Sequence, residues 1–349
     1  MIPGPVRRTL DGLSRDPPAL AARDVAICDP GPYVAPRWLR GGHAQTIWPY
    51  FLRRPHVPLR REPVDTADGD VWQFDWLQTP HTVHAPLVVL FHGLEGSSSS
   101  HYARALLAAL ADIGWRGVVP HFRGCPAEPN RLPRAYHSGD HAEIDAMLAA
   151  VRARAGPGVM LHACGVSLGG SALLNWLGRS GTAARETLVS AAAVSAPLDL
   201  MAAGEAIDRG LNRIYAKHFL RTLKPKALAM ASRHPGAIDA TRVRRVRSMW
   251  QFDDLVTAPL HGFHGTHDYW TRATSKPWLA RIAIPTFVLN ALNDPFVPGD
   301  SLPRPGDVAA SVVLEQPAGG GHVGFLRGPA PGRLDWLPRR LIAFFASHG

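Results

Sequence analysis

A serine stands between two glycines in the segment Gly165-Val166-Ser167-Leu168-Gly169, which fits the pattern G-x-S-x-G. An apolar run at residues 159–164 precedes it, and another at residues 171–177 follows it. The first run is typical of a short buried strand and the second of the apolar face of a helix. A serine at such a strand-to-helix turn exposes its hydroxyl, as a nucleophile must. We therefore predict that Ser167 is a nucleophile; the alternative is a plain glycine-rich turn.

Two loops late in the chain carry an acid and a base. Asp294 follows an apolar run that ends near Leu289, and His322 lies in a glycine-rich loop after the next apolar run. The chain order serine, aspartate, histidine is that of one class of catalytic triad. His322 would take the proton of Ser167, and Asp294 would hold the imidazole tautomer and stabilise the imidazolium. Asp268 is the competing acid, but it precedes the penultimate predicted strand, so we favour Asp294.

The loop at residues 92–97, HGLEGS, follows the apolar run at residues 87–91. A loop after this strand often supplies one backbone N–H to an oxyanion hole, and the residue after the nucleophile supplies the other. We predict that the N–H groups of Leu94 and Leu168 form this hole, with an ordinary turn as the alternative. The sequence has no phosphate-binding P-loop, no dinucleotide fingerprint and no spaced Cys/His cluster, so we expect neither a cofactor nor a metal.

The elements that must position these residues alternate between strands and helices. Strands are expected at residues 72–76, 86–91, 117–122, 158–164, 188–194, 284–289 and 311–314, and helices at 102–113, 141–154, 168–178 and 334–345. Short, continuously apolar strands that alternate with helices predict an α/β fold with a mostly parallel central sheet and helices on both faces.

The pattern changes after residue 197, where helical periodicity continues without a clear buried strand. We expect a helical cap that is inserted late in the core, after about the seventh strand. The predicted division is an N-terminal extension at 1–35, a first part of the core at 36–197, the cap at 198–275 and a second part of the core at 276–349.

The formal net charge of +10 comes from one segment, because Arg209 to Arg247 contains eleven Lys and Arg residues and one acidic residue. Cations recur every four residues there and predict one basic helix face: Arg209, Arg213, Lys217 and Arg221. Apolar and aromatic residues are expected nearer the opposite face: Leu211, Ile214, Tyr215, His218 and Phe219. A solvated face is the ordinary explanation, and transient contact with an anionic membrane is the functional hypothesis. No nucleic-acid partner is expected, and the oligomeric state is not predicted.

Three cysteines, Cys28, Cys125 and Cys164, show no C-x-x-C spacing. No apolar run approaches the roughly 18–20 residues that cross a bilayer, and the first residues lack the apolar centre of a signal peptide. We therefore expect reduced cysteines and a cytoplasmic location.

The sequence resembles the YheT-like branch of the α/β hydrolases over most of its length, from about Trp38 to His322. The resemblance rests on RWLRGGHAQT at residues 37–46, HGLEGS at 92–97, FRGC at 122–125, GVSLGG at 165–170, and the segment from Gly262 to Asp294. It implies an α/β-hydrolase fold, a nucleophile at Ser167 with Asp294 and His322 as its relay, and ester substrates of the acylglycerol or short- to medium-chain acyl type. Trp270 stands where a tyrosine is usual and Phe287 where an aliphatic residue is usual, which affects the shape of the pocket at most.

These observations predict a serine hydrolase that cleaves carboxylic esters through an acyl-enzyme. An acyltransferase is the nearest alternative, because the same acyl-enzyme can react with an alcohol instead of water. A catalytically silent hydrolase fold that serves as a binding module is the alternative outside enzymes.

Overall fold

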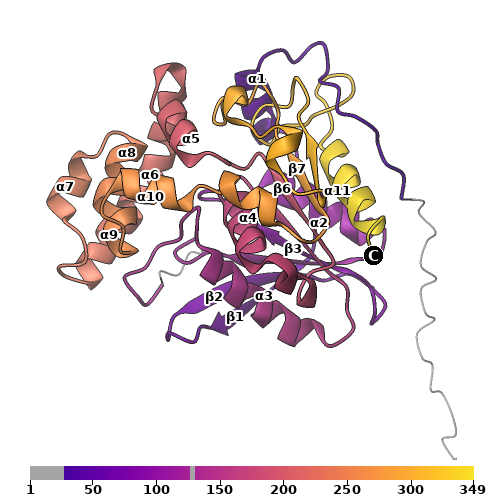
Figure 1. The fold of residues 1–349 in the computed structure, drawn as a ribbon, viewed down its shortest axis with the longest axis horizontal. Helices are drawn as coiled ribbons and strands as arrows, with labels where there is room; N and C mark the ends of the chain where they lie inside the picture. The colour runs from indigo at the N-terminus through magenta and orange to yellow at the C-terminus, as the bar shows by residue number, and fades with distance from the viewer. Residues whose placement is uncertain (1–26, 126–129) are drawn as a thin grey trace, which may run out of the picture.

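The computed structural model describes residues 27–125 and 130–349. One eight-stranded sheet runs through it in the order β1-β2-β4-β3-β5-β6-β7-β8 (Figure 1). The strands are β1 Leu59–Asp65, β2 Val71–Leu77, β3 Leu87–Phe91, β4 Arg116–His121, β5 Leu161–Val166, β6 Ser190–Val194, β7 Thr286–Leu289 and β8 Val312–Glu315. β2 pairs antiparallel with β1 and with β4, and the pairs from β4 to β8 are parallel.

Helices cover both faces of this sheet. The helices are α1 Gly42–Ile47, α2 His101–Asp112, α3 His141–Ala155, α4 Leu168–Ser180, α5 Leu200–Ile207, α6 Arg213–Arg233, α7 Ala240–Arg245, α8 Met249–Phe252, α9 Ala258–Leu260, α10 Thr266–Ala273 and α11 Trp336–Ala346, with one π-helical turn at Asp253–Thr257. The mostly parallel sheet between helical layers confirms the predicted fold class.

The alternation of β3 explains the two layers. Val89 and Phe91 belong to the core that includes residues of α3 and α4. Val88 and Leu90 belong to the core that includes residues of α2 and α11. Successive side chains of a strand point to opposite faces, so a strand that is apolar at every position packs against helices on both sides.

The helices α5 to α10 come between β6 and β7 along the chain, and they gather on one side of the sheet (Figure 1). They have a hydrophobic cluster of their own, which includes Leu220, Val243 and Phe252. The insertion follows the sixth strand, one strand earlier than the expected position after about the seventh. The cap boundaries at residues 198 and 275 stay a prediction.

Residues 1–26 of the predicted N-terminal extension lie outside the described residues. Within the described chain, no helix combines the length and apolar character that crossing a bilayer requires.

Candidate active site

Ser167 occupies the turn between β5 and α4 with a φ of +53° and a ψ of −120°. Such a left-handed conformation is costly for a residue with a Cβ and is held only where the surroundings impose it. Both neighbouring glycines are required by close packing. A Cβ on Gly165 would lie 2.5 Å from the carbonyl oxygen of Gly169, and a Cβ on Gly169 would lie 2.5 Å from that of His92. Glycine at these two positions therefore permits the close approach of β5, α4 and the loop after β3 on which the turn at Ser167 depends.

The structure brings Ser167, His322 and Asp294 together. His322 Nε2 lies 3.0 Å from Ser167 Oγ, and His322 Nδ1 lies 2.8 Å from Asp294 Oδ2. A carboxylate only accepts, so Nδ1 carries the proton and Nε2 is free to accept one from the serine. This is the arrangement that a general base needs before attack on a carbonyl carbon.

Asp294 is buried and fixed on its other oxygen as well. Its Oδ1 accepts hydrogen bonds from the backbone N–H groups of Phe296 at 2.8 Å and Val297 at 3.3 Å. The ring of Phe296 also packs against His322, with ring centroids 4.3 Å apart. The competing acid Asp268 lies on α10, where it pairs with Arg272 at 3.1 Å.

The Gly93–Leu94 peptide is oriented by its carbonyl group. The Gly93 oxygen accepts from His92 Nδ1 at 2.8 Å and from Gly96 N–H at 2.9 Å. His92 Nε2 accepts from Phe122 N–H at 3.2 Å, which places the proton on Nδ1. Burial lowers the pKa of His92 to about 3, so the ring stays neutral. Because a trans peptide points its N–H opposite to its C=O, the Leu94 N–H turns away from these donors.

The Ser167–Leu168 peptide is fixed in the same way. The Ser167 carbonyl accepts from Ser171 N–H at 3.1 Å inside the first turn of α4. The Leu168 N–H therefore points out of the start of the helix, where it has no intrahelical acceptor. In the described chain, no backbone hydrogen bond occupies the N–H of Leu94 or Leu168. Both residues line the same cavity as Ser167 and His322.

Gln45 and Thr46 of α1 hold the two late loops in place, although neither had a predicted role of its own. Gln45 Oε1 accepts from Gly320 N–H at 2.7 Å and from Asn293 Nδ2 at 2.9 Å, so one buried amide joins both loops. Thr46 Oγ1 accepts from His322 N–H at 2.8 Å. The signal was present in RGGHAQT, which carried the family resemblance without any indication of what it contacts.

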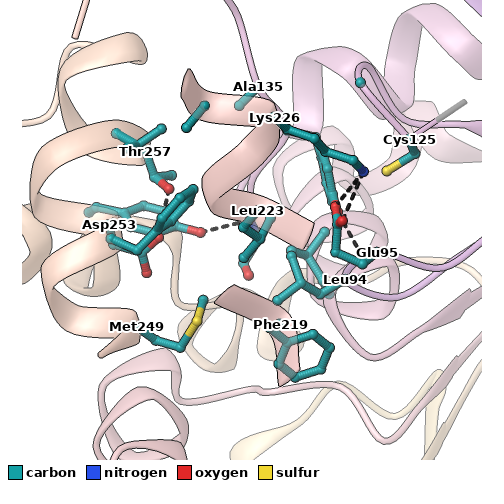
Figure 2. Close-up of a pocket in the computed structure, with 18 of the residues that line it drawn as sticks. Leu94, Glu95, Cys125, Ala135, Phe219, Leu223, Lys226, Met249, Asp253 and Thr257 are labelled. Atoms are coloured by element: carbon teal, nitrogen blue, oxygen red, sulfur yellow. Dashed lines mark hydrogen bonds and ion pairs between the residues drawn. The ribbon is translucent and has the colours of Figure 1, made fainter. Parts of the chain in front are cut away.

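The cavity in front of Ser167 measures about 630 Å³ and is mainly apolar. Figure 2 shows Phe219, Leu223 and Met249 of the cap among its walls. Polar groups stand on opposite sides. The ion pair of Lys226 with Glu95, 2.8 Å long, lies on one side, and Asp253 lies on the other (Figure 2).

Asp253 is a carboxyl group of the cap that lies on the wall of this cavity. It accepts from Thr257 Oγ1 at 2.6 Å and from Trp270 Nε1 at 2.8 Å. Burial raises the pKa of Asp253 to about 6, against the effect of these two hydrogen bonds. Trp270, one of the two departures from the family pattern, thus lines the cavity, whereas Phe287 packs against Phe344 in the core.

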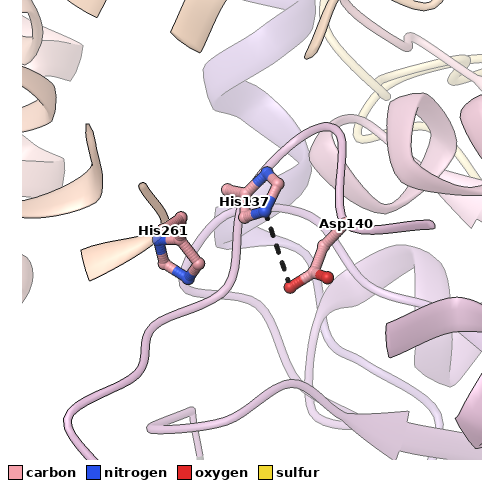
Figure 3. A group of neighbouring side chains, drawn as sticks. All are labelled: His137, Asp140 and His261. Atoms are coloured by element: carbon pink, nitrogen blue, oxygen red, sulfur yellow. Dashed lines mark ion pairs between the residues drawn. The ribbon is translucent and has the colours of Figure 1, made fainter. Parts of the chain in front are cut away.

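One group of potential metal ligands, His137, Asp140 and His261, lies at the junction of core and cap (Figure 3). Its atoms already serve other bonds. His137 Nδ1 accepts from Gly139 N–H, so the neutral ring carries its proton on Nε2, which lies 3.9 Å from Asp140 Oδ2. Both ring nitrogens of His261 face backbone carbonyls, at 2.8 and 3.0 Å. The set fits a hydrogen-bonded junction better than a metal site.

Comparison with known proteins places the chain in a family. A family profile described as "alpha/beta hydrolase fold" matches residues 86–329. The protein of Escherichia coli (strain K12) named "Putative esterase YheT" is 36% identical, over 88% of this chain and 91% of its own. "Phospholipase ABHD3" of Mus musculus is 30% identical, over 91% of this chain and 79% of its own. The structure of the Pyrococcus furiosus esterase Pf2001 covers 86% of this chain and 99% of its own with a TM-score of 0.54 at 14% identity, which supports the fold. The chain therefore belongs to the α/β-hydrolase fold family, in its YheT-like branch, and is an enzyme of the ester-hydrolase type.

Proposed function

We propose that the protein is a serine hydrolase that cleaves carboxylic esters through a Ser-His-Asp triad and an acyl-enzyme. The observation that carries this proposal is the chain of hydrogen bonds from Ser167 Oγ through His322 to Asp294. Ser167 and His322 line a mainly apolar cavity.

Acylation begins when Ser167 Oγ attacks the ester carbonyl carbon and transfers its proton to His322 Nε2. The Leu94 and Leu168 N–H groups stabilise the negative oxygen of the tetrahedral intermediate. His322 then protonates the leaving alkoxide, and the acyl group stays on Ser167. Asp294 holds the imidazolium through both steps and keeps its own negative charge.

Deacylation repeats the sequence with water as the nucleophile. His322 removes a proton from the water, and the hydroxide adds to the acyl carbon. The second tetrahedral intermediate collapses, His322 returns the proton to Ser167 Oγ, and a carboxylic acid leaves. An alcohol in place of water would make the same site an acyltransferase.

The cavity supports an ester with an apolar acyl part. Cap side chains such as Phe219, Leu223 and Met249 can bury methylene groups, at about 0.8 kcal/mol for each one removed from water. We propose short- to medium-chain acyl esters or acylglycerol-type lipids as the substrates.

The test is covalent labelling by a fluorophosphonate probe. Wild-type protein should label, and Ser167→Ala should not. Ser171→Ala is the matched control, because Ser171 lies one helical turn away, buried and without a side-chain hydrogen-bond partner among the described residues. A folded wild type that does not label would contradict the proposal and favour a binding module. A series of p-nitrophenyl esters of rising acyl length, with and without an alcohol acceptor, then separates substrates and the two reaction types.

A further inference from the structure

α6 separates two cavities. Its inner face contributes Phe219 and Leu223 to the catalytic cavity. Its outer face contributes Ile214 and Leu228 to a second cavity of about 780 Å³, which we name the cap groove. Pro225 borders both cavities. The cap groove therefore lies one helix away from the catalytic cavity, on the outside of the cap.

The cap groove is strongly cationic. Six of its lining residues carry a positive charge: Arg213, Lys217, Arg221, Lys224, Arg244 and Arg247. No carboxylate lines the groove, and within the described residues no ion pair engages any of the six. Arg209, by contrast, is paired with Glu205 at 2.8 Å. Several uncompensated cations around one concave surface produce a positive potential that attracts an anion.

The shape of the groove is fixed by hydrogen bonds between α6 and the end of α7. Lys224 Nζ donates to the carbonyl oxygens of Arg244 at 2.8 Å and Val246 at 3.0 Å. These bonds hold the cations of α7 beside those of α6. The remaining basic residues of α7, Arg242 and Arg245, are exposed but do not line the groove.

Apolar side chains accompany the cations. Ile214, which lines the groove, is 55% exposed, and Leu211, in the 3₁₀ turn before α6, is 73% exposed. Both were expected nearer the face opposite the cations, and for Ile214 this is wrong, because it lies in the groove with them. Cations beside exposed aliphatic residues suit the boundary between lipid headgroups and acyl chains.

We propose that the cap groove binds the phosphate headgroup of an anionic phospholipid in a bilayer and so holds the outer face of α6 on the membrane surface. The groove cations contact the headgroup phosphate, and Ile214 and Leu211 enter the upper acyl region. This gives the transient membrane contact of the basic segment a defined site. It goes beyond the proposed ester hydrolysis, because binding requires neither Ser167 nor turnover.

The test is co-sedimentation of Ser167→Ala protein, which prevents lipid hydrolysis, with vesicles of phosphatidylcholine that contain or lack phosphatidylglycerol. Arg221→Gln/Arg244→Gln removes two groove cations, and Arg242→Gln/Arg245→Gln is the matched control with equal loss of charge beside the groove. With about 1 kcal/mol per basic residue at an anionic surface, the groove variant should bind anionic vesicles roughly 10- to 30-fold more weakly. The control should lose less than about threefold, since the headgroup does not contact its residues directly.

Equal losses in the two variants would overturn the proposal and leave a diffuse basic surface. Wild-type-like binding to vesicles without phosphatidylglycerol, or binding to duplex DNA that depends on the same groove cations, would overturn it as well. If inorganic phosphate binds the cap groove as tightly as the anionic vesicles and displaces the protein from them, the groove is a site for free anions. That result would also refute the lipid assignment. Ile214→Ser should weaken vesicle binding without altering competition by phosphate.

The same charge variants, made in protein that retains Ser167, should hydrolyse a water-soluble p-nitrophenyl ester at the wild-type rate. If the wild-type protein does not hydrolyse this ester, the proposed function is contradicted, but the vesicle result still stands. The two proposals can therefore fail separately.

Discussion

Replacement of Gln45 by leucine tests how much the site depends on α1. Gln45 is buried, with 4% exposure, and its side chain makes three hydrogen bonds. Oε1 accepts from Gly320 and Asn293, and Nε2 donates to the Leu39 carbonyl at 2.8 Å. Leucine has a similar volume and no polar atom. Gln45→Leu therefore removes all three bonds without creating a large void.

The magnitude follows from the groups left unpaired. A buried donor or acceptor without a partner costs about 1–3 kcal/mol, so three of them cost roughly 3–9 kcal/mol if nothing moves. That is comparable with the whole unfolding free energy of a typical domain, about 5–15 kcal/mol. Gly320 and Asn293 stand beside His322 and Asp294, so we expect the two loops to shift and recover part of the cost. We predict a loss of about 2–4 kcal/mol in unfolding free energy and a kcat lower by roughly 100-fold, because a displacement near 1 Å has that effect.

The assay combines urea unfolding with steady-state hydrolysis of a p-nitrophenyl ester. The fall should appear in kcat more than in KM, because Gln45 does not line the cavity. Gln45→Glu keeps an acceptor for both loops and should recover part of kcat. Gln316→Leu is the control, since it removes a single bond, to the Pro303 carbonyl at 2.9 Å. A folded Gln45→Leu protein with kcat within threefold of wild type would refute the positioning role.

Three further predictions concern single residues. Asp294→Asn should lower kcat by roughly 10³–10⁴-fold in ester hydrolysis while the protein stays folded, because an amide can favour the wrong tautomer of His322. Gly169→Ala should cost about 3 kcal/mol in urea unfolding, because its Cβ would meet the carbonyl oxygens of Phe91 and His92 at 2.6 and 2.5 Å. Asp253 has a pKa raised from 3.8 to about 6 by burial, so its contribution to stability is present below pH 4 and is lost as the pH rises through about 6. The check is urea unfolding of Asp253→Asn and wild type at pH 4 and pH 7. From pH 4 to pH 7 the unfolding free energy of the variant should rise by up to about 3 kcal/mol relative to that of wild type, and equal changes in both proteins would refute the assignment.

The elements around Ser167 were predictable because their signals are local. Strand, turn and helix all lie within twenty residues, and the glycine spacing reports a steric need that the structure shows directly. The expected strand at 158–164 is shifted in the structure to Leu161–Val166. Gly165 and Val166, which were assigned to the turn, continue the pairing with β6 up to the residue before Ser167.

The support of the late loops could not be predicted, because its partners are far apart in sequence. Gln45 reaches Asn293 and Gly320 across 248 and 275 residues. The segment that carries it has no clear hydrophobic period, and α1 is only six residues long. β1 was missed for a related reason: its residues are mostly exposed at an edge of the sheet, so it lacks the alternation that identified β2.

Ile214 was misplaced because residues four apart are not exactly aligned on a helix with 3.6 residues per turn; they drift by about 40° at each step. Arg213, Lys217 and Arg221 therefore spread around α6 toward the angle of Ile214, which lies on their side of the helix. Arg209 and Leu211 precede α6, and residues 210–212 form a 3₁₀ turn.

The same helix connects the two proposed sites. On its inner side Lys226 pairs with Glu95, whose N–H donates to Tyr136 Oη at 2.8 Å and which directly follows Leu94. The Lys226 side chain is 41% exposed, so the ion pair contributes no more than about 1 kcal/mol. The same side of α6 also contacts the core through Tyr215 and Phe219, whose rings pack against Phe296, and Tyr215 Oη lies 3.0 Å from His43 Nδ1. A headgroup bound in the cap groove would therefore rest on a helix whose other side touches both Glu95 of the oxyanion loop and Phe296, the residue packed against His322.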